Sequence, residues 1–171
     1  LGDSLLPGRY EPSSLFAPRK LAVVGRDLLL DYSVPKIRDL ALPPKLQIHQ
    51  GERIALLGPN GIGKTSLLTQ LAADFPSARM VPERVEDFFV CQSLAEELAR
   101  ADRVAKAPKG LTQLTLESLV AVDQGLLNTH PRDLSAGTKL ALALSMQLSF
   151  KPQLLLVDEP VKGLDPIARE R

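Results

Sequence analysis

Eight residues in the first half of the chain have the types and spacing of a phosphate-binding loop. They read Gly-Pro-Asn-Gly-Ile-Gly-Lys-Thr over residues 58–65 and match G-x-x-x-x-G-K-[ST] at every fixed position. Glycines let successive backbone N–H groups point at one anion, and a helix that starts at the loop adds the positive end of its dipole. The lysine can reach the β- and γ-phosphates of a nucleotide, and the threonine hydroxyl can ligate Mg²⁺. The loop alone does not separate ATPases from GTPases or small-molecule kinases. The expected nucleotide-binding residues are Gly58, Pro59, Asn60, Gly61, Gly63, Lys64, Thr65 and Ser66.

Two adjacent carboxylates, Asp158 and Glu159, follow four aliphatic residues at 154–157. If these aliphatics form a buried parallel strand, the carboxylates lie at the edge of the sheet where ligands bind. We expect Asp158 to hold Mg²⁺, through a water, and Glu159 to polarise the water that attacks the γ-phosphate. The alternative is a strand that ends in a solvated Asp-Glu turn, which is common by itself.

A third candidate segment precedes the longest helical stretch of the chain, over residues 135–150. Ser135 is a good N-cap, and Gly137 can bring a backbone N–H close to an anion. If this segment stood alone, an ordinary capped helix would be the better interpretation.

These candidates need strands and helices to position them. Apolar runs predict strands over 21–24, 28–30, 45–50, 53–57 and 154–157, and helical spacing predicts helices over 63–73, 93–100, 115–122 and 135–150. In the helix over 93–100 we expect Leu94, Ala95 and Leu98 to face inward and Glu96 and Glu97 to face outward. Two buried strands that flank helical material indicate an α/β domain. Proline and glycine in the first 20 residues predict a linker or tail.

Composition excludes several classes of protein. The 171 residues carry a net charge of +1, 4% aromatic residues and no Trp, so we expect no nucleic-acid partner. No window approaches 18 consecutive apolar residues, so no bilayer-spanning helix is expected. The single cysteine, Cys91, excludes an internal disulfide and is typical of a reducing cytoplasm. The two histidines, His49 and His130, lack companion ligands for a metal site.

The order of the motifs resembles that of ATP-binding cassette (ABC) ATPases from about Leu21 to Arg171. As in that family, the phosphate loop is followed by Leu-Ser-Ala-Gly, then by a helix, then by Leu-Leu-Leu-Val-Asp-Glu-Pro, and finally by Gly-Leu-Asp. The resemblance implies a P-loop NTPase fold with a mainly parallel core sheet, an antiparallel β edge subdomain and a helical subdomain at about 84–134. It implies that two such domains pair head to tail around two ATP molecules. By this resemblance, Tyr32 stacks on adenine, Ser135, Ala136 and Gly137 act on the partner's nucleotide, and Asp165 belongs to the loop between the two sites.

Two departures from the family pattern concern the signature and a glutamine. The usual Leu-Ser-Gly-Gly-Gln is Leu-Ser-Ala-Gly-Thr here, and the glutamine position before the helical subdomain holds Glu83. The stretch over 81–98 resembles the energy-coupling-factor importers in particular, some of which carry two cassettes in one polypeptide. We therefore expect residues 21–171 to be an ABC ATPase domain that is incomplete at its C-terminus. It lacks the switch histidine of the family and could be the second cassette of such a pair.

The leading functional hypothesis is an ATPase that uses ATP and Mg²⁺ to power transport of a solute. It predicts as partners a second ABC ATPase domain and integral membrane subunits, with the chain at the cytoplasmic face of the membrane. One alternative is a soluble ABC ATPase of DNA repair or translation. Another is a cassette that binds ATP in a structural or regulatory role, which the altered signature and Glu83 favour and the intact Glu159 opposes.

Overall fold

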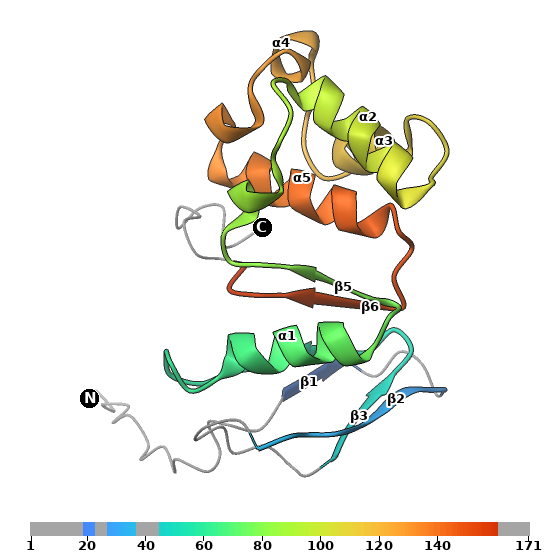
Figure 1. Cartoon of the computed structure of the whole chain (residues 1–171), viewed down its shortest axis with the longest axis vertical. Helices are drawn as coiled ribbons and strands as arrows, with labels where there is room; N and C mark the ends of the chain where they lie inside the picture. Colours follow the sequence, from blue (N-terminus) through green and yellow to red (C-terminus); the bar gives the residue numbers. More distant parts are fainter. Residues whose placement is uncertain (1–18, 23–26, 37–44, 161–171) are drawn as a thin grey trace, which may run out of the picture. The chain divides into compact units, whose positions relative to one another are not determined.

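The structure is a computed structural model that describes residues 19–22, 27–36 and 45–160, with the side chains of the last two ranges. The chain divides into two compact units, Leu1–Leu67 and Leu68–Arg171, and each is described by itself. Figure 1 labels the helices and strands. Within the described ranges, no helix is both long and apolar enough to cross a membrane.

The described strands of the first unit form two antiparallel pairs. Strand β1 (Arg19–Ala22) pairs with β4 (Arg53–Ala55), and β2 (Leu28–Ser33) pairs with β3 (Lys45–His49). The alternation predicted for 45–50 is confirmed, because Leu46 and Ile48 are buried and their neighbours on β3 are more exposed. The strand predicted over 53–57 is shorter than expected and is antiparallel to β1.

A buried carboxylate closes the turn between β3 and β4. The Glu52 side chain is fully buried, and its Oε2 accepts the backbone N–H of His49 at 2.8 Å. Gly51 takes a positive φ of 70° at the tip of this turn, a conformation that glycine adopts without strain.

Helix α1 (Lys64–Asp74) follows the phosphate loop, as its spacing predicts. Leu67 and Leu71 are almost fully buried and lie one helical turn apart, which gives the helix one apolar side. The helix ends just before Phe75 and Pro76, where the chain turns toward the next strand.

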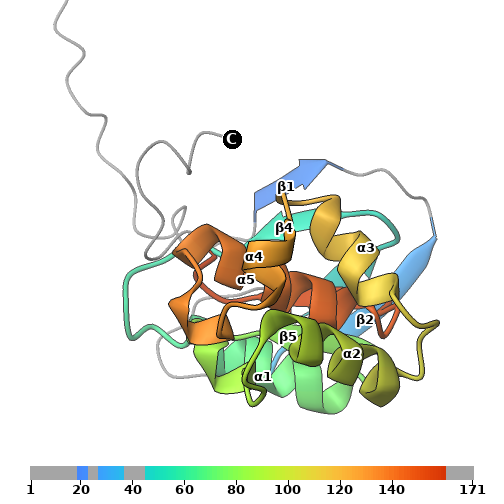
Figure 2. The ribbon, with the colours of Figure 1, turned by 90° about the horizontal axis from the view of Figure 1, so that it is seen from above.

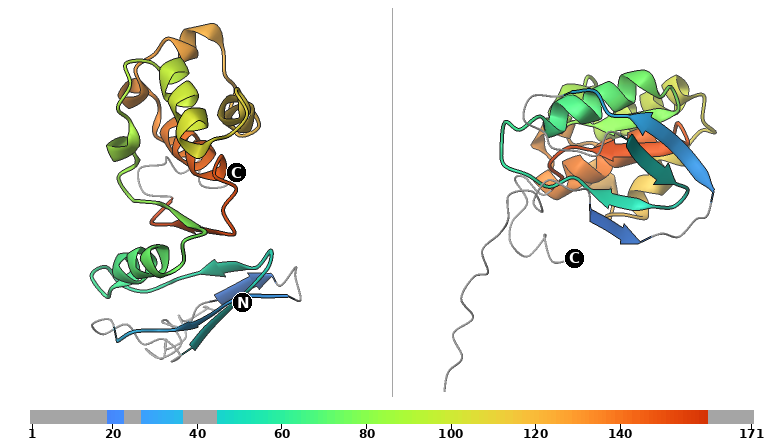
Figure 3. Two further views of the ribbon diagram at one scale, coloured as in Figure 1. Left: turned by 45° about the vertical axis from the view of Figure 1, so that its right-hand side comes forward. Right: turned by 90° about the horizontal axis from the view of Figure 1, so that it is seen from below.

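The second unit contains a parallel strand pair covered by helices. Strand β5 (Ala78–Val81) pairs in parallel with β6 (Leu154–Val157). Helix α5 (Ala136–Leu148) lies between this pair and the helices α2 (Leu94–Ala105) and α3 (Leu111–Glu117), as Figures 1 and 3 show. The shorter elements are η2 (Val85–Phe88), α4 (Gln124–Leu127) and η3 (Pro131–Asp133). Figure 2 views this helical layer from above.

One apolar core joins the strands and helices of the second unit. Leu94, Leu116 and Leu142 come from three different helices, are completely buried and belong to one cluster with Val81 of β5. This cluster fixes α5 against β5, which sets where the N-terminus of α5 lies relative to the end of that strand. The same cluster also contains Val85, Phe89, Leu98, Ala101, Leu134, Ala141, Ala143 and Met146.

A buried polar chain connects the ends of three helices. Asp102 near the end of α2 accepts hydrogen bonds from the backbone N–H groups of Gly110 and Thr112, at 2.6 and 2.9 Å. The Thr112 hydroxyl lies 2.6 Å from both Asp102 and the Ser149 hydroxyl after α5. All three side chains are buried, so α2, α3 and α5 are tied together by satisfied polar groups as well as by apolar packing.

The prediction for the two faces of α2 is wrong at Ala95 and Glu97. Ala95 is exposed, whereas the Glu97 side chain is fully buried. Glu97 is buried because its two carboxylate oxygens are bonded to Arg100 and to the backbone before the helix, so its charge is compensated. Helix α2 also extends five residues beyond its predicted end, to Ala105, and α3 begins at Leu111 instead of at 115.

Candidate nucleotide-binding site

Glycines at positive φ shape the backbone of the phosphate loop (residues 58–65). The φ angles of Gly58, Gly61 and Gly63 are 158°, 80° and 114°. A Cβ on Gly61 would meet no heavy atom within 4 Å, so the backbone conformation and not crowding requires glycine there. The loop therefore has an open side at its tip, which suits a ligand bound by backbone N–H groups.

The lysine of the loop folds back over it. Lys64 Nζ donates to the carbonyl oxygens of Gly58 and Pro59, at 2.9 and 3.1 Å. These bonds hold the ammonium group over the loop. The same region therefore supplies a positive charge as well as N–H donors, which fits a phosphate.

The first turn of α1 presents two hydroxyl groups to solvent. Thr65 and Ser66 are exposed, while Gly63 is buried and its carbonyl accepts the Leu67 N–H at 3.0 Å, which starts the helix. No acidic side chain lies in this first turn, so the positive end of the helix dipole is not offset there. The arrangement fits anion binding at the helix N-terminus, and hydroxyl oxygen is a ligand type that hard cations accept.

The carboxyl ends of β5 and β6 form an acidic edge in the second unit. The Asp158 N–H donates to the Val81 carbonyl at 2.9 Å, which extends the strand pairing by one residue. Asp158 is only 4% exposed, and Glu159 next to it is half-buried. Glu83 follows β5 by two residues and is exposed. Because β5 and β6 are parallel, Glu83, Asp158 and Glu159 all lie at one edge of the pair.

Glu159 has an unusual backbone conformation. Its φ is 45°, in the left-handed region that costs a residue with a Cβ about 1 kcal/mol. Strained residues of this kind cluster at functional sites, where the surrounding structure holds them in place. The strain occurs at the carboxylate to which the sequence assigns the catalytic role.

The signature turn (residues 134–138) begins helix α5. Ser135 is the N-cap, and its Oγ accepts the Thr138 N–H at 3.2 Å and lies 2.8 Å from the Thr138 hydroxyl. Leu134 is buried in the core, whereas Ser135 and Ala136 are exposed. The turn is thus anchored by its leucine and presents its serine at the surface. Thr138 occupies the position of the glutamine in the usual Leu-Ser-Gly-Gly-Gln signature, and it is hydrogen-bonded to Ser135.

The remaining predicted residues lie as follows. Tyr32 is half-buried on β2, opposite Leu46 of β3. Asp165 lies outside the described residues. Tyr32 and the phosphate loop belong to the first unit, and the acidic edge and the signature turn belong to the second.

Two ion pairs near these segments were missed by the sequence analysis. Lys139 in the first turn of α5 pairs with Glu86 of η2 at 3.3 Å, and Arg100 pairs with Glu97 within α2 at 2.7 Å. The i, i+3 spacing of Glu97 and Arg100 is a usable signal for an intrahelical pair. Nothing in the sequence signals the pair between Lys139 and Glu86, which are 53 residues apart.

Comparison with known proteins identifies the family. Residues 43–162 match the family described as ABC transporter, which is well over half of the chain. The chain therefore belongs to the ABC transporter family, as an ATP-binding domain.

Several named relatives are ATP-binding proteins of this family. An ABC transporter ATP-binding protein of Streptomyces coelicolor is 37% identical over 150 residues, which cover 74% of this chain and 26% of the relative. The energy-coupling factor transporter ATP-binding protein of Methanothermobacter thermautotrophicus is 30% identical over 171 residues, which cover 82% of this chain and 53% of the relative. The chain thus spans about a quarter of the Streptomyces relative and about half of the other.

A solved structure supports the fold. The inward-facing structure of a metal-chelate type ABC transporter superposes with a TM-score of 0.62 at 18% identity, over 82% of this chain and 62% of that one. At this identity the likeness concerns the fold alone. It confirms the expected P-loop NTPase class, with mixed parallel and antiparallel strands and helices.

Proposed function

We propose that this chain binds ATP with Mg²⁺ and hydrolyses the ATP to power transport of a solute through separate membrane subunits. The observation that carries the proposal is the phosphate loop, in which glycines at positive φ surround an open tip and Lys64 folds over the loop. Membership of the ABC transporter family supports ATP as the nucleotide. The relatives include ATP-binding proteins named for aliphatic sulfonate import and sulfate or thiosulfate import, which supports transport as the work done.

Each candidate residue has a role in this proposal. The backbone N–H groups of the loop over 58–66, to which Pro59 contributes none, and the Lys64 ammonium bind the phosphates. Tyr32 stacks on the adenine. The Thr65 hydroxyl and the Asp158 carboxylate hold Mg²⁺, for which oxygen ligands are suited, and Glu83 lies near that metal. The bound cation offsets phosphate charge during hydrolysis. Glu159 accepts a proton from the attacking water.

The signature turn acts on the nucleotide of a second cassette. The exposure of Ser135 and Ala136 at the start of α5 supports this role, because a partner's phosphate needs access to Ser135, Ala136 and Gly137. The helical part at about 84–134 leads into this turn, and residues 21–171 form the ATPase domain. Asp165 belongs to the loop between the two sites. We place the chain at the cytoplasmic face of the membrane, bound to integral membrane subunits.

Two variants of the full-length protein with its partners test the proposal. Lys64→Ala lowers ATP affinity by about 100-fold or more, because the charge that neutralises the triphosphate is lost. Glu159→Gln keeps ATP affinity and lowers turnover by about 100-fold or more, because an amide keeps the shape but is not a base. Nucleotide titration and phosphate release measure the two effects, and circular dichroism monitors the fold. Unchanged affinity of Lys64→Ala, or persistent turnover of Glu159→Gln, would contradict the assignment.

A second candidate function is ATP binding without turnover at the composite site. The contact between the Ser135 and Thr138 hydroxyls favours it, because this serine is already engaged within its own helix. The Thr138→Gln variant distinguishes the two functions when it is compared with the native protein in the assembled transporter. If the native protein turns over ATP normally and Thr138→Gln adds nothing, the purely structural role is excluded.

A further inference from the structure

An ion pair connects the signature turn to the segment that follows β5. Lys139 Nζ lies 3.3 Å from Glu86 Oε1, and the Lys139 side chain is 17% exposed while that of Glu86 is 42% exposed. The pKa of the Glu86 carboxyl is lowered, first by a hydrogen bond from its own backbone and then by the Lys139 ammonium. The lysine is immediately beyond the signature turn, and the glutamate is three residues beyond Glu83. The pair therefore joins two segments to which the proposed function gives separate roles.

Apolar packing brings the same two segments together. Leu134 of the signature turn and Val85 of η2 belong to the same buried cluster, and α5 packs against η2. The hydrophobic effect is non-directional, so it favours contact between the two segments without selecting one orientation. The pair between the Lys139 ammonium and the Glu86 carboxylate adds a second contact, at one defined position on each segment.

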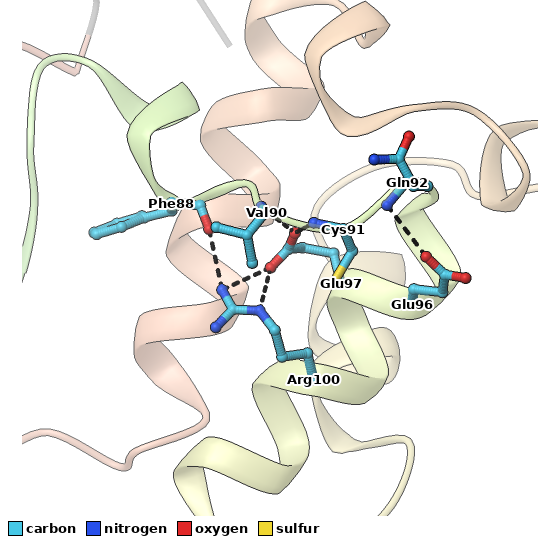
Figure 4. A network of polar contacts seen from close by, with 7 residues as sticks. All are labelled: Phe88, Val90, Cys91, Gln92, Glu96, Glu97 and Arg100. Atoms are coloured by element: carbon cyan, nitrogen blue, oxygen red, sulfur yellow. Dashed lines mark hydrogen bonds and ion pairs between the residues drawn. The ribbon is translucent and has the colours of Figure 1, made fainter.

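The segment that carries Glu86 is itself held at both ends. At its start, the Val81 carbonyl accepts the Asp158 N–H, which ties the segment to the acidic edge. At its end, Glu97 Oε2 accepts the N–H groups of Val90 and Cys91, at 2.8 and 2.9 Å. Arg100 donates to the Phe88 carbonyl at 3.0 Å and pairs with Glu97 (Figure 4). Glu86 thus lies in a segment that is hydrogen-bonded at both ends, and Lys139 pairs with it.

We propose that Lys139 is a positioning residue: through Glu86 it fixes the orientation of the signature turn relative to the acidic edge that carries Asp158. This inference rests on the proposed function, because orientation of the turn affects turnover only if the turn acts on ATP. Lys139 touches neither substrate nor metal in this role. Its loss leaves nucleotide binding at the phosphate loop unchanged and slows hydrolysis.

Charge reversal tests the pair in the full-length protein with its partners. Glu86→Lys and Lys139→Glu each lower kcat by about 3- to 10-fold, the size of a typical contact-pair coupling, with KM within about twofold. The double variant Glu86→Lys/Lys139→Glu recovers at least about half of the native kcat, because the pair is restored with its charges exchanged. Asp87→Lys is the matched control, since Asp87 is an exposed acid in the same 3₁₀ turn, and we expect it to leave kcat unchanged. Native kcat in both single variants, or no recovery in a folded double variant, would overturn the proposal.

Amide hydrogen exchange tests the same pair without any need for turnover. The single variants speed exchange at the N–H groups of residues 138–140, and the double variant slows it again, while Asp87→Lys resembles the native chain. If exchange there is the same in the native chain, both single variants and the double variant, Lys139 does not hold the turn and the proposal fails even if ATP hydrolysis is robust. If the Lys64→Ala test fails while exchange follows the pair, the proposed function is wrong but the anchoring of the turn is not.

Discussion

In the phosphate loop, three glycines at positive φ and one lysine that bonds to backbone carbonyls define the shape of the chain. In the helical part of the second unit, two buried carboxylates do so, with Glu97 fixing the backbone before α2 and Asp102 fixing the start of α3. The backbone shape of the loop depends on glycines that can adopt positive φ at fixed positions. The backbone shape of the helical part depends on carboxylates that accept several hydrogen bonds. The two regions should therefore respond to different kinds of substitution.

Glu97→Ala has the largest expected effect on stability. The substitution removes the ion-pair partner of Arg100, and the Arg100 side chain is 30% exposed. It also leaves the Val90 and Cys91 N–H groups without their acceptor. Because the Glu97 carboxylate is fully buried and accepts from both backbone and side chain, losing this network costs about 3 kcal/mol of unfolding free energy, with the partly exposed Arg100 contributing little. Urea unfolding measures the loss.

Glu96→Ala is the matched control for Glu97→Ala. Glu96 is the neighbouring exposed acid and accepts one hydrogen bond, from the Gln92 N–H at 3.1 Å (Figure 4). We expect it to cost less than about 1 kcal/mol. Equal losses in the two variants would mean that burial of the carboxylate does not determine the stability of this region.

Asp102→Asn has an intermediate effect that depends on pH. An amide presents N–H donors where Gly110 and Thr112 also donate, so we expect a loss of about 1–3 kcal/mol at pH 7. The pKa of Asp102 is lowered from its ordinary value of 3.8; burial opposes the shift, and the hydrogen bonds from Thr112 and Gly110 outweigh it. A lowered pKa in the folded state means that the charge stabilises the fold above about pH 4, and that this stabilisation is lost as the pH falls through the folded-state pKa.

The difference in unfolding free energy between the native chain and Asp102→Asn should therefore narrow below about pH 4. Asp123→Asn is the control, because Asp123 is an exposed N-cap that donates nothing and accepts the Leu126 N–H, a role asparagine fills equally well. A difference that stays constant from pH 7 to pH 3 would show that the ionised form of Asp102 is not what stabilises the region.

Gly61→Ala has a smaller expected effect than Asp102→Asn, about 1 kcal/mol. The methyl group meets no neighbouring atom, so the cost is that of holding alanine at a φ of 80°. Gly125→Ala in α4 is the comparison, since Gly125 is not among the glycines with positive φ, and an added Cβ would lie 3.3 Å from Asp123. In urea unfolding, Gly125→Ala should lose no more unfolding free energy than Gly61→Ala. A loss of several kcal/mol at Gly61 would mean that the open tip of the loop is crowded.

The same contrast explains what could be predicted from the sequence. The phosphate loop, the Ser135 cap and the strand before Asp158 depend on residue types at fixed spacing, and the sequence predicts them at the positions where they occur. Strand β5 was not predicted, because its four residues include Arg79, and a short strand is defined mainly by its partner β6. Glu97 was assigned to the wrong face for a related reason. Hydrophobic periodicity predicts that charged residues face solvent. It takes no account of backbone N–H groups that can compensate a buried carboxylate.

The hydrogen bond from the Cys91 N–H to the buried Glu97 carboxylate has a consequence for chemical labelling. Cys91 is the only cysteine of the chain, and burial, followed by the nearby Glu97 carboxylate, raises its pKa above the ordinary 9.0. At pH 7 less than about 1% of the thiol is therefore ionised, and only the thiolate reacts quickly with alkylating agents. The native chain thus contains one slow reporter group, located where the segment after β5 meets α2. Its alkylation half-life reports changes in the surroundings of the thiol at that junction, without any engineered cysteine.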